Sequence, residues 1–88
     1  MYLSVTEVKP LAGYKLHLTF SNGEEKIFDV SPYLNTGKFT ELRDLSLFNS
    51  VTIKFDAVEW PNHLDIDPEF LHEKSIAIND ERISAVSP

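Results

Sequence analysis

One turn signal, the pair Asn22-Gly23, constrains the fold of this chain more than any other feature. Residues 14–20 before it alternate between apolar and polar side chains, and residues 24–30 form a second run with strand character. An Asn-Gly pair between two such runs is the strongest short-range signal for a β-hairpin, because both residues accept the left-handed backbone of a tight turn. We therefore predict an antiparallel hairpin here. Its first strand turns these residues toward the core: Tyr14, Leu16, Leu18 and Phe20.

Further short strands are expected on both sides of this hairpin. Residues 2–8 are predicted to form one strand, which Pro10 closes because proline cannot donate a hydrogen bond to a sheet. Residues 51–55 alternate with their odd-numbered members facing inward, and a turn at residues 56–57 leads to a short return strand over residues 58–60. The sequence thus predicts a small, mostly antiparallel sheet of about five short strands.

Two segments carry helical signals. In the first, apolar residues recur every three positions, which is typical of one face of a helix or of two helical turns. These residues are Phe39, Leu42, Leu45 and Phe48. The second segment begins at Asp67, a favourable N-cap residue, followed by Pro68, which suits the first helical position, and Glu69, whose charge complements the helix dipole. We therefore expect two or three short helices and an α+β fold.

Length and composition limit the class of protein. Eighty-eight residues suffice for one core, so we predict a single α+β domain over residues 1–74 and a C-terminal tail over residues 75–88 whose packing the pattern does not define. The chain has no cysteine, which excludes disulfides, thiolate metal sites and a cysteine nucleophile and favours a cytoplasmic location. It also lacks a signal peptide and any apolar run long enough to cross a membrane, so we expect no membrane partner.

The negative charge is concentrated in the second half of the chain. The net charge is −6, and residues 51–88 hold eight acidic and three basic residues, which gives them −5. Such a surface repels phosphate, so direct nucleic-acid binding is disfavoured, and it attracts a small basic protein. The alternative is a solvated acidic surface that only aids solubility. The predicted interaction surface consists of Glu59, Trp60, Asn62, His63, Asp65, Asp67, Glu69 and Glu73.

Two members of that set have competing interpretations. Trp60 would anchor an interface, but a domain this small also needs each large side chain for its core. The potential metal ligands His63, Asp65, Asp67 and His72 raise the alternative of a metal-dependent small enzyme or accessory protein. The simpler interpretation is that the two aspartates cap backbone and His63 lies in a turn. No nucleophile elbow or glycine-rich phosphate loop is present, so we predict no enzyme, no catalytic residue and no cofactor.

The order of these features resembles the bacterial domain-of-unknown-function family 2442, over about residues 3–74. The most specific part is a run of Trp, Pro, Asn, Asp, Pro, Glu and Leu after the hairpin and the helical segment. In this chain the resemblance is carried by residues 16–23, 28–34, 39–44, Trp60-Pro61-Asn62, Asp65, Pro68-Glu69 and Leu71. His63 stands where the family typically has Gly, and His72 where it often has Tyr. We expect Asn62 to take the left-handed conformation instead of His63.

The resemblance implies a small α+β fold with no established catalytic residues. Members are often encoded beside another small protein, which implies a toxin–antitoxin pair with this family as the antitoxin. Some members carry a helix-turn-helix domain, so a regulatory accessory that acts through a DNA-binding partner is a further alternative. Exposed sheet edges also allow a homodimer.

Overall fold

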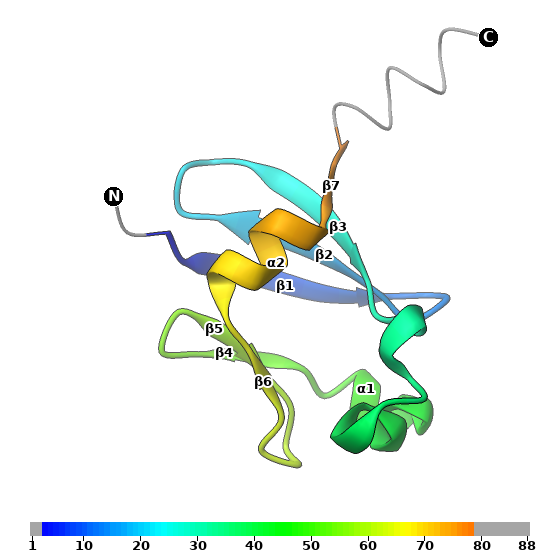
Figure 1. Ribbon diagram of the computed structural model, residues 1–88. Helices are drawn as coiled ribbons and strands as arrows, with labels where there is room; N and C mark the ends of the chain where they lie inside the picture. Colours follow the sequence, from blue (N-terminus) through cyan, green and yellow to red (C-terminus); the bar gives the residue numbers. More distant parts are fainter. Residues whose placement is uncertain (1–2, 79–88) are drawn as a thin grey trace, which may run out of the picture.

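The computed structural model describes residues 3–78, which form two antiparallel sheets (Figure 1). The first sheet has the order β1-β2-β3-β7 and the second the order β4-β5-β6. The strands of the first sheet are β1 (Val5–Leu11), β2 (Lys15–Phe20), β3 (Glu25–Asp29) and β7 (Ile76–Ala77). Those of the second are β4 (Thr52–Lys54), β5 (Ala57–Glu59) and β6 (Asp65–Ile66).

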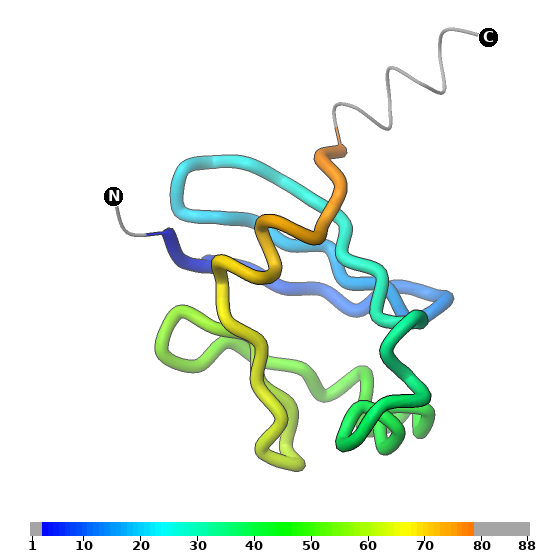
Figure 2. The backbone as a smooth tube through the Cα atoms, in the orientation of Figure 1, coloured from blue at the N-terminus to red at the C-terminus, as the bar shows by residue number. Residues whose placement is uncertain are grey.

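Short helices connect the two sheets. The chain leaves β3 through two 3₁₀-helices and one turn of α-helix, enters the second sheet, and returns through a last helix to the edge of the first sheet (Figure 2). These helices are η1 (Ser31–Tyr33), η2 (Gly37–Arg43), α1 (Leu45–Phe48) and α2 (Pro68–Lys74). The fold is therefore α+β, as predicted. None of the helices within residues 3–78 is long and apolar enough to cross a bilayer.

The predicted hairpin is confirmed as β2 and β3. Its loop has three residues, because the amide of Gly23 donates to the carbonyl of Phe20 at 2.9 Å and the amide of Phe20 donates to Glu24 at 2.9 Å. Gly23 adopts φ = 90°, the left-handed conformation that such a loop requires. Leu16, Leu18 and Phe20 are buried, while Tyr14 lies just before the strand and is half-buried.

The prediction of about five strands was too low, because the described residues contain seven. Strands β6 and β7 have two residues each, too few to show a pattern in the sequence. Strand β7 pairs with β3, so Ile76 and Ala77, which we assigned to the tail, belong to the first sheet. Residues 79–88 of that tail, and Tyr2 of the predicted first strand, lie outside the described residues. Strand β1 also runs through Pro10, since among the described residues it pairs with β2 alone and can tolerate proline.

The second hairpin differs from the prediction by one residue. Ile53 pairs with Val58, so the turn lies at Phe55-Asp56 and not at Asp56-Ala57. Phe55 consequently leaves the strand, and 87% of its surface is exposed. The prediction that Phe55 faces inward is wrong.

The helical predictions hold in part. Leu42 and Phe48 are buried and Phe39 is half-buried, but Leu45 is 56% exposed because η2 ends before it and α1 begins a new direction at Asp44. Asp67 occupies the N-cap position of α2 as predicted, although its side chain makes no cap hydrogen bond.

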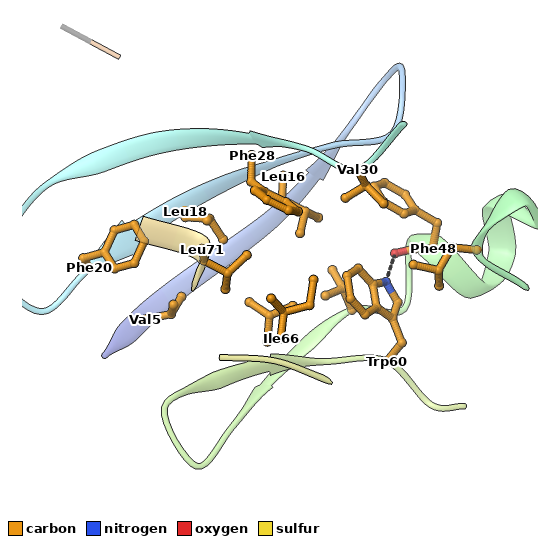
Figure 3. Close-up of a cluster of buried hydrophobic side chains, with 13 residues drawn as sticks. Val5, Leu16, Leu18, Phe20, Phe28, Val30, Phe48, Trp60, Ile66 and Leu71 are labelled. Carbon is orange, nitrogen blue, oxygen red and sulfur yellow. Dashed lines mark hydrogen bonds between the residues drawn. The ribbon is translucent and has the colours of Figure 1, made fainter. Parts of the chain in front are cut away.

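The core lies between the two sheets and beneath α2 (Figure 3). Trp60 is 1% exposed and lies beside Phe48 toward one end of this core (Figure 3), where its indole Nε1–H donates to the carbonyl oxygen of Phe48 at 3.0 Å. The buried hydrophobic residues are Val5, Leu16, Leu18, Phe20, Phe28, Val30, Leu42, Phe48, Val51, Val58, Trp60, Ile66 and Leu71. The same packing leaves the opposite face of the second sheet open to solvent among the described residues.

Candidate functional site: the outer face of the second sheet

The pairing of the second sheet places Thr52, Glu59 and Asp65 in one row across its outer face. Thr52 lies opposite Glu59, and Glu59 lies opposite Asp65. Directly opposed residues share a face of a sheet, and the neighbouring pair Val58 and Ile66 is buried on the other side. Two carboxylates therefore stand side by side on the face that is turned away from the core.

Glu59 and Asp65 form an unfavourable pair in the isolated domain, because like charges directly opposite each other destabilise a sheet. The Nζ of Lys54 lies 3.8 Å from Oε1 of Glu59 and supplies one positive charge to this face. Its side chain is 59% exposed, whereas that of Glu59 is 20% exposed. The outer face thus keeps a net negative charge, with a loosely held lysine beside the better-shielded carboxylate.

A hollow of about 290 Å³ opens on this face. Its lining residues carry two hydroxyl groups, one carboxylate, one ammonium group and one imidazole. Its lining residues are Ser50, Thr52, Lys54, Glu59, Trp60, Pro61 and His63. A larger hollow of about 410 Å³ lies between the edge strands β1 and β4, and its charged lining residues are Glu7 and Lys9, which balance each other.

Strained turns lie at both ends of the sheet. Phe55 and Asp56 adopt φ = 52° and 71°, and His63 adopts φ = 69°. Left-handed backbone is unfavourable for residues other than glycine, and strain of this kind is concentrated at functional sites. The amide of Val5 donates to the carbonyl of Asp56 at 3.1 Å, which ties the Phe55 turn to the first sheet.

Asn62 and His63 form the other turn. The side chain of Asn62 accepts a hydrogen bond from the amide of Leu64 at 3.2 Å and donates to Oε1 of Glu41 at 2.9 Å. His63 itself takes the left-handed conformation, so our expectation that Asn62 would do so is wrong. Asn62 therefore organises the turn, and the exposed ring of His63 is left at the rim of the hollow.

The carboxylates of α2 lie on a neighbouring surface. Asp67, Glu69 and Glu73 are exposed, and Asp65 precedes them on β6. With Glu59 they form what we call the acidic surface, which comprises Glu59, Asp65, Asp67, Glu69 and Glu73. Four of the five are exposed, and Glu59 is half-buried.

His72 is turned toward the first sheet. Its Nε2 lies 2.6 Å from Oε1 of Glu24, and its carbonyl oxygen accepts a hydrogen bond from Nζ of Lys26 at 2.6 Å. Hydrogen bonds from Asn22 and then from His72 hold the pKa of Glu24 below its usual value. These contacts attach α2 to the β2–β3 hairpin, so His72 has a structural role in this arrangement.

The structure does not assemble the potential ligands of the metal-dependent alternative. His63, Asp65, Asp67 and His72 do not converge, and residues 3–78 contain no group of three or more His, Asp or Glu side chains placed to hold a metal ion. The metal-dependent alternative therefore has no supporting geometry in this part of the chain.

Comparison with models of known protein families gives a match to this chain. The sequence model of the family described as "Protein of unknown function (DUF2442)" matches residues 5–77. The chain belongs to the DUF2442 family. This match confirms the resemblance noted from the sequence and extends it through β7. No curated protein and no solved structure gives a significant match to this DUF2442 member.

The interaction surface predicted from the sequence of this DUF2442 member differs from the outer face seen in the structure by one residue too many and two too few. Trp60 was predicted to belong to it, but the side chain is buried, and the competing interpretation as a core residue is correct. Lys54 and Phe55 were missed, because the alternation of residues 51–55 suggested a longer strand. The sequence holds no signal for the observed turn, because Phe is uncommon in tight turns and the pair Phe-Asp therefore argues against a turn at residues 55–56.

Proposed function

We propose that this DUF2442 domain is a small acidic interaction module that binds a basic protein, as the antitoxin-like member of a toxin–antitoxin pair would. The observation that carries the proposal is the outward display of the acidic surface, whose carboxylates share two sheet strands and one helix. Residues 54–74 hold six carboxylates and only two lysines. A patch with this imbalance accelerates association with an oppositely charged partner and selects against acidic ones.

The arrangement of hydrogen bonds supports a surface role. Among the acidic surface, Glu59 has an ion pair with Lys54, and no carboxylate of the set is drawn into a buried network within residues 3–78. Carboxylates used by a catalyst would instead be expected to converge on a cleft. The acidic surface is therefore suited to intermolecular pairing.

The test is affinity capture of the full chain from its native cells at low ionic strength. We expect an equimolar small protein rich in lysine and arginine, released as salt is raised, because screening shortens the range of charge interactions from about 10 Å at 0.1 M to about 3 Å at 1 M salt. Elution of the domain alone at low salt would contradict the proposal.

Matched variants separate the acidic surface from overall charge. Glu69→Gln with Glu73→Gln removes two carboxylates from α2 and is expected to lower the yield of the basic protein. Glu7→Gln with Glu25→Gln removes two carboxylates from the outer face of the first sheet, where both residues are exposed, and should leave the yield unchanged.

A further inference from the structure

We infer that the outer face of the second sheet receives an arginine side chain of the basic protein partner at the position of the Lys54 ammonium group, which lines the hollow and lies near both the carboxylate of Glu59 and the ring of Phe55. The inference rests on the proposed function and names the place and chemistry of the contact. It follows from four features of the sheet: an internal cation, an excess of carboxylate, an exposed ring and the open space of the hollow.

Lys54 shows which charge this place accepts. Its Nζ lies 3.8 Å from Glu59 Oε1 and 5.8 Å from the centroid of the Phe55 ring. A cation thus already sits between a carboxylate and an aromatic face, the two groups that favour positive charge. Because the lysine side chain is 59% exposed, it is held weakly and an incoming guanidinium can displace it. Arginine suits the place better, since its planar group pairs with a carboxylate and stacks on a ring together.

The carboxylates of the sheet outnumber its cations. Glu59 and Asp65 stand directly opposite each other, and Lys54 is the one lysine or arginine that lines the hollow. His63 at the rim is the remaining titratable group of the lining. A second cation would relieve the repulsion between the two carboxylates.

Phe55 has no role in the packing of the described domain. It is 87% exposed and adopts φ = 52°, so the chain carries a bulky side chain where a turn with two left-handed residues favours Asn or Gly. A sequence that breaks a local rule without a gain in folding points to a functional position. The hydrogen bond from Val5 to Asp56 fixes the turn, and a pre-positioned aromatic ring is a typical interface anchor.

The hollow provides open space beside Glu59. At about 290 Å³ it lies just under the range of about 300–1,000 Å³ typical of sites that enclose whole small molecules. It is open to solvent above the sheet, as a contact with a protein surface requires. An arginine from a partner can therefore approach Glu59 from the open side of the hollow, with the Phe55 ring next to Lys54.

A single arginine side chain provides a direct probe. We propose titrating the ¹⁵N-labelled full chain with N-acetyl-arginine amide and, in parallel, with N-acetyl-citrulline amide, which is close in shape but uncharged. We expect saturable shifts from the arginine probe at the amides of Thr52, Lys54, Glu59 and His63, with a dissociation constant of about 1–10 mM, as one side chain without the rest of a partner can give. The citrulline probe should give none.

Variants then test each contact. Glu59→Gln and Phe55→Ala should each weaken arginine binding about threefold to tenfold, and thermal unfolding of both variants checks that the fold is kept. Lys54→Met should strengthen binding, because it removes the internal competitor. Lys74→Met, which removes the same charge from α2, should strengthen binding less.

Shifts that spread equally to Glu69 and Glu73, or binding that Glu59→Gln and Phe55→Ala leave unchanged, would overturn the inference. So would the absence of any saturable shift. In each case a basic protein captured from native cells at low salt would still support the proposed function. Failure of the capture experiment, by contrast, would remove the partner on which this site depends.

Discussion

His72 and Glu24 are 48 positions apart in the sequence, yet the imidazole Nε2 of the first lies 2.6 Å from the carboxylate Oε1 of the second. The imidazole also packs edge-on against Phe20, with ring centroids 5.1 Å apart. The contact joins the last turn of α2 to the loop of the first hairpin. It is thus a polar link between α2 and the first sheet, beside the bond from Lys26 to the His72 carbonyl.

This link predicts a loss of stability in acid. The pKa of Glu24 is lowered from its usual 4.5, so the folded state favours the ionised carboxylate more than the unfolded state does. The stabilisation is present above pH 4.5 and is lost as the pH falls through the lowered folded-state pKa. Urea unfolding of wild type and Glu24→Gln should therefore differ at neutral pH and converge in acid. Glu7→Gln is the control, and equal midpoints for wild type and Glu24→Gln at neutral pH would contradict the assignment.

Lys26 makes a second link to α2 that can be tested separately. Its side chain lies on the core face of β3, is 9% exposed, and donates from Nζ to the carbonyl of His72. Lys26→Met keeps the apolar stem but leaves the His72 carbonyl with only the long hydrogen bond from the Ser75 hydroxyl at 3.4 Å, which should cost about 1 kcal/mol of unfolding free energy. Lys15→Met, at an exposed position of β2, should cost much less. Similar losses of unfolding free energy in the two variants, measured by urea unfolding, would show that the hydrogen bond from Lys26 to the His72 carbonyl does not stabilise the fold.

Trp60 should be essential to the core. Trp60→Phe removes the hydrogen bond to the Phe48 carbonyl and leaves a void beside it, so we expect a loss of about 2–4 kcal/mol of unfolding free energy. Because Trp60 is the only tryptophan, unfolding of this variant is followed by circular dichroism. In the wild type the buried indole should emit at short wavelength and shift to long wavelength on unfolding. An emission maximum typical of a solvated indole in the native protein would contradict its burial.

The left-handed turn at His63 offers a stabilising substitution. His63→Gly removes the steric cost of φ = 69° and should raise the unfolding free energy by about 0.5–1 kcal/mol, after the entropy of glycine in the unfolded chain is subtracted. His63→Ala keeps the steric cost and should not stabilise. A thermal midpoint for the glycine variant no higher than that of the alanine variant would show that the turn is not strained.

The local parts of the fold could be predicted from the sequence. The Asn22-Gly23 turn and the alternation before it specify the first hairpin, because both signals lie within a few residues of the structure they define. The start of α2 was equally local, since Asp67 and Pro68 mark it by backbone preference alone. The small size of the chain supported a buried Trp60, but the sequence left this open beside the interpretation as a surface anchor, and we included Trp60 in the predicted interaction surface.

The remaining parts depend on contacts between distant segments. A turn at Phe55-Asp56 and one at Asp56-Ala57 both bury the apolar residues of β4 and β5, so alternation cannot choose between them. The hydrogen bond from Val5 to Asp56 fixes the observed turn, and it joins segments about fifty positions apart. Strand β7 likewise forms only because α2 delivers it to the edge of β3.

In the candidate site, too, some features follow from local sequence and others depend on contacts between distant segments. The outward direction of Asp67, Glu69 and Glu73 could be expected from their position on a short surface helix. The opposition of Glu59 and Asp65 needed the strand register, and the placement of Lys54 beside Phe55 needed the turn. Local patterns indicate neither of these contacts.

The central claim is that the acidic surface binds a basic protein. The most direct test is low-salt capture from native cells with the wild-type chain and with a variant that carries Glu59→Gln, Asp65→Asn, Glu69→Gln and Glu73→Gln. We predict that the wild type retains an equimolar basic protein and that the variant, with a thermal midpoint no lower than that of the wild type, retains none. Elution of the wild type alone, or equal retention by the folded variant, would contradict the claim.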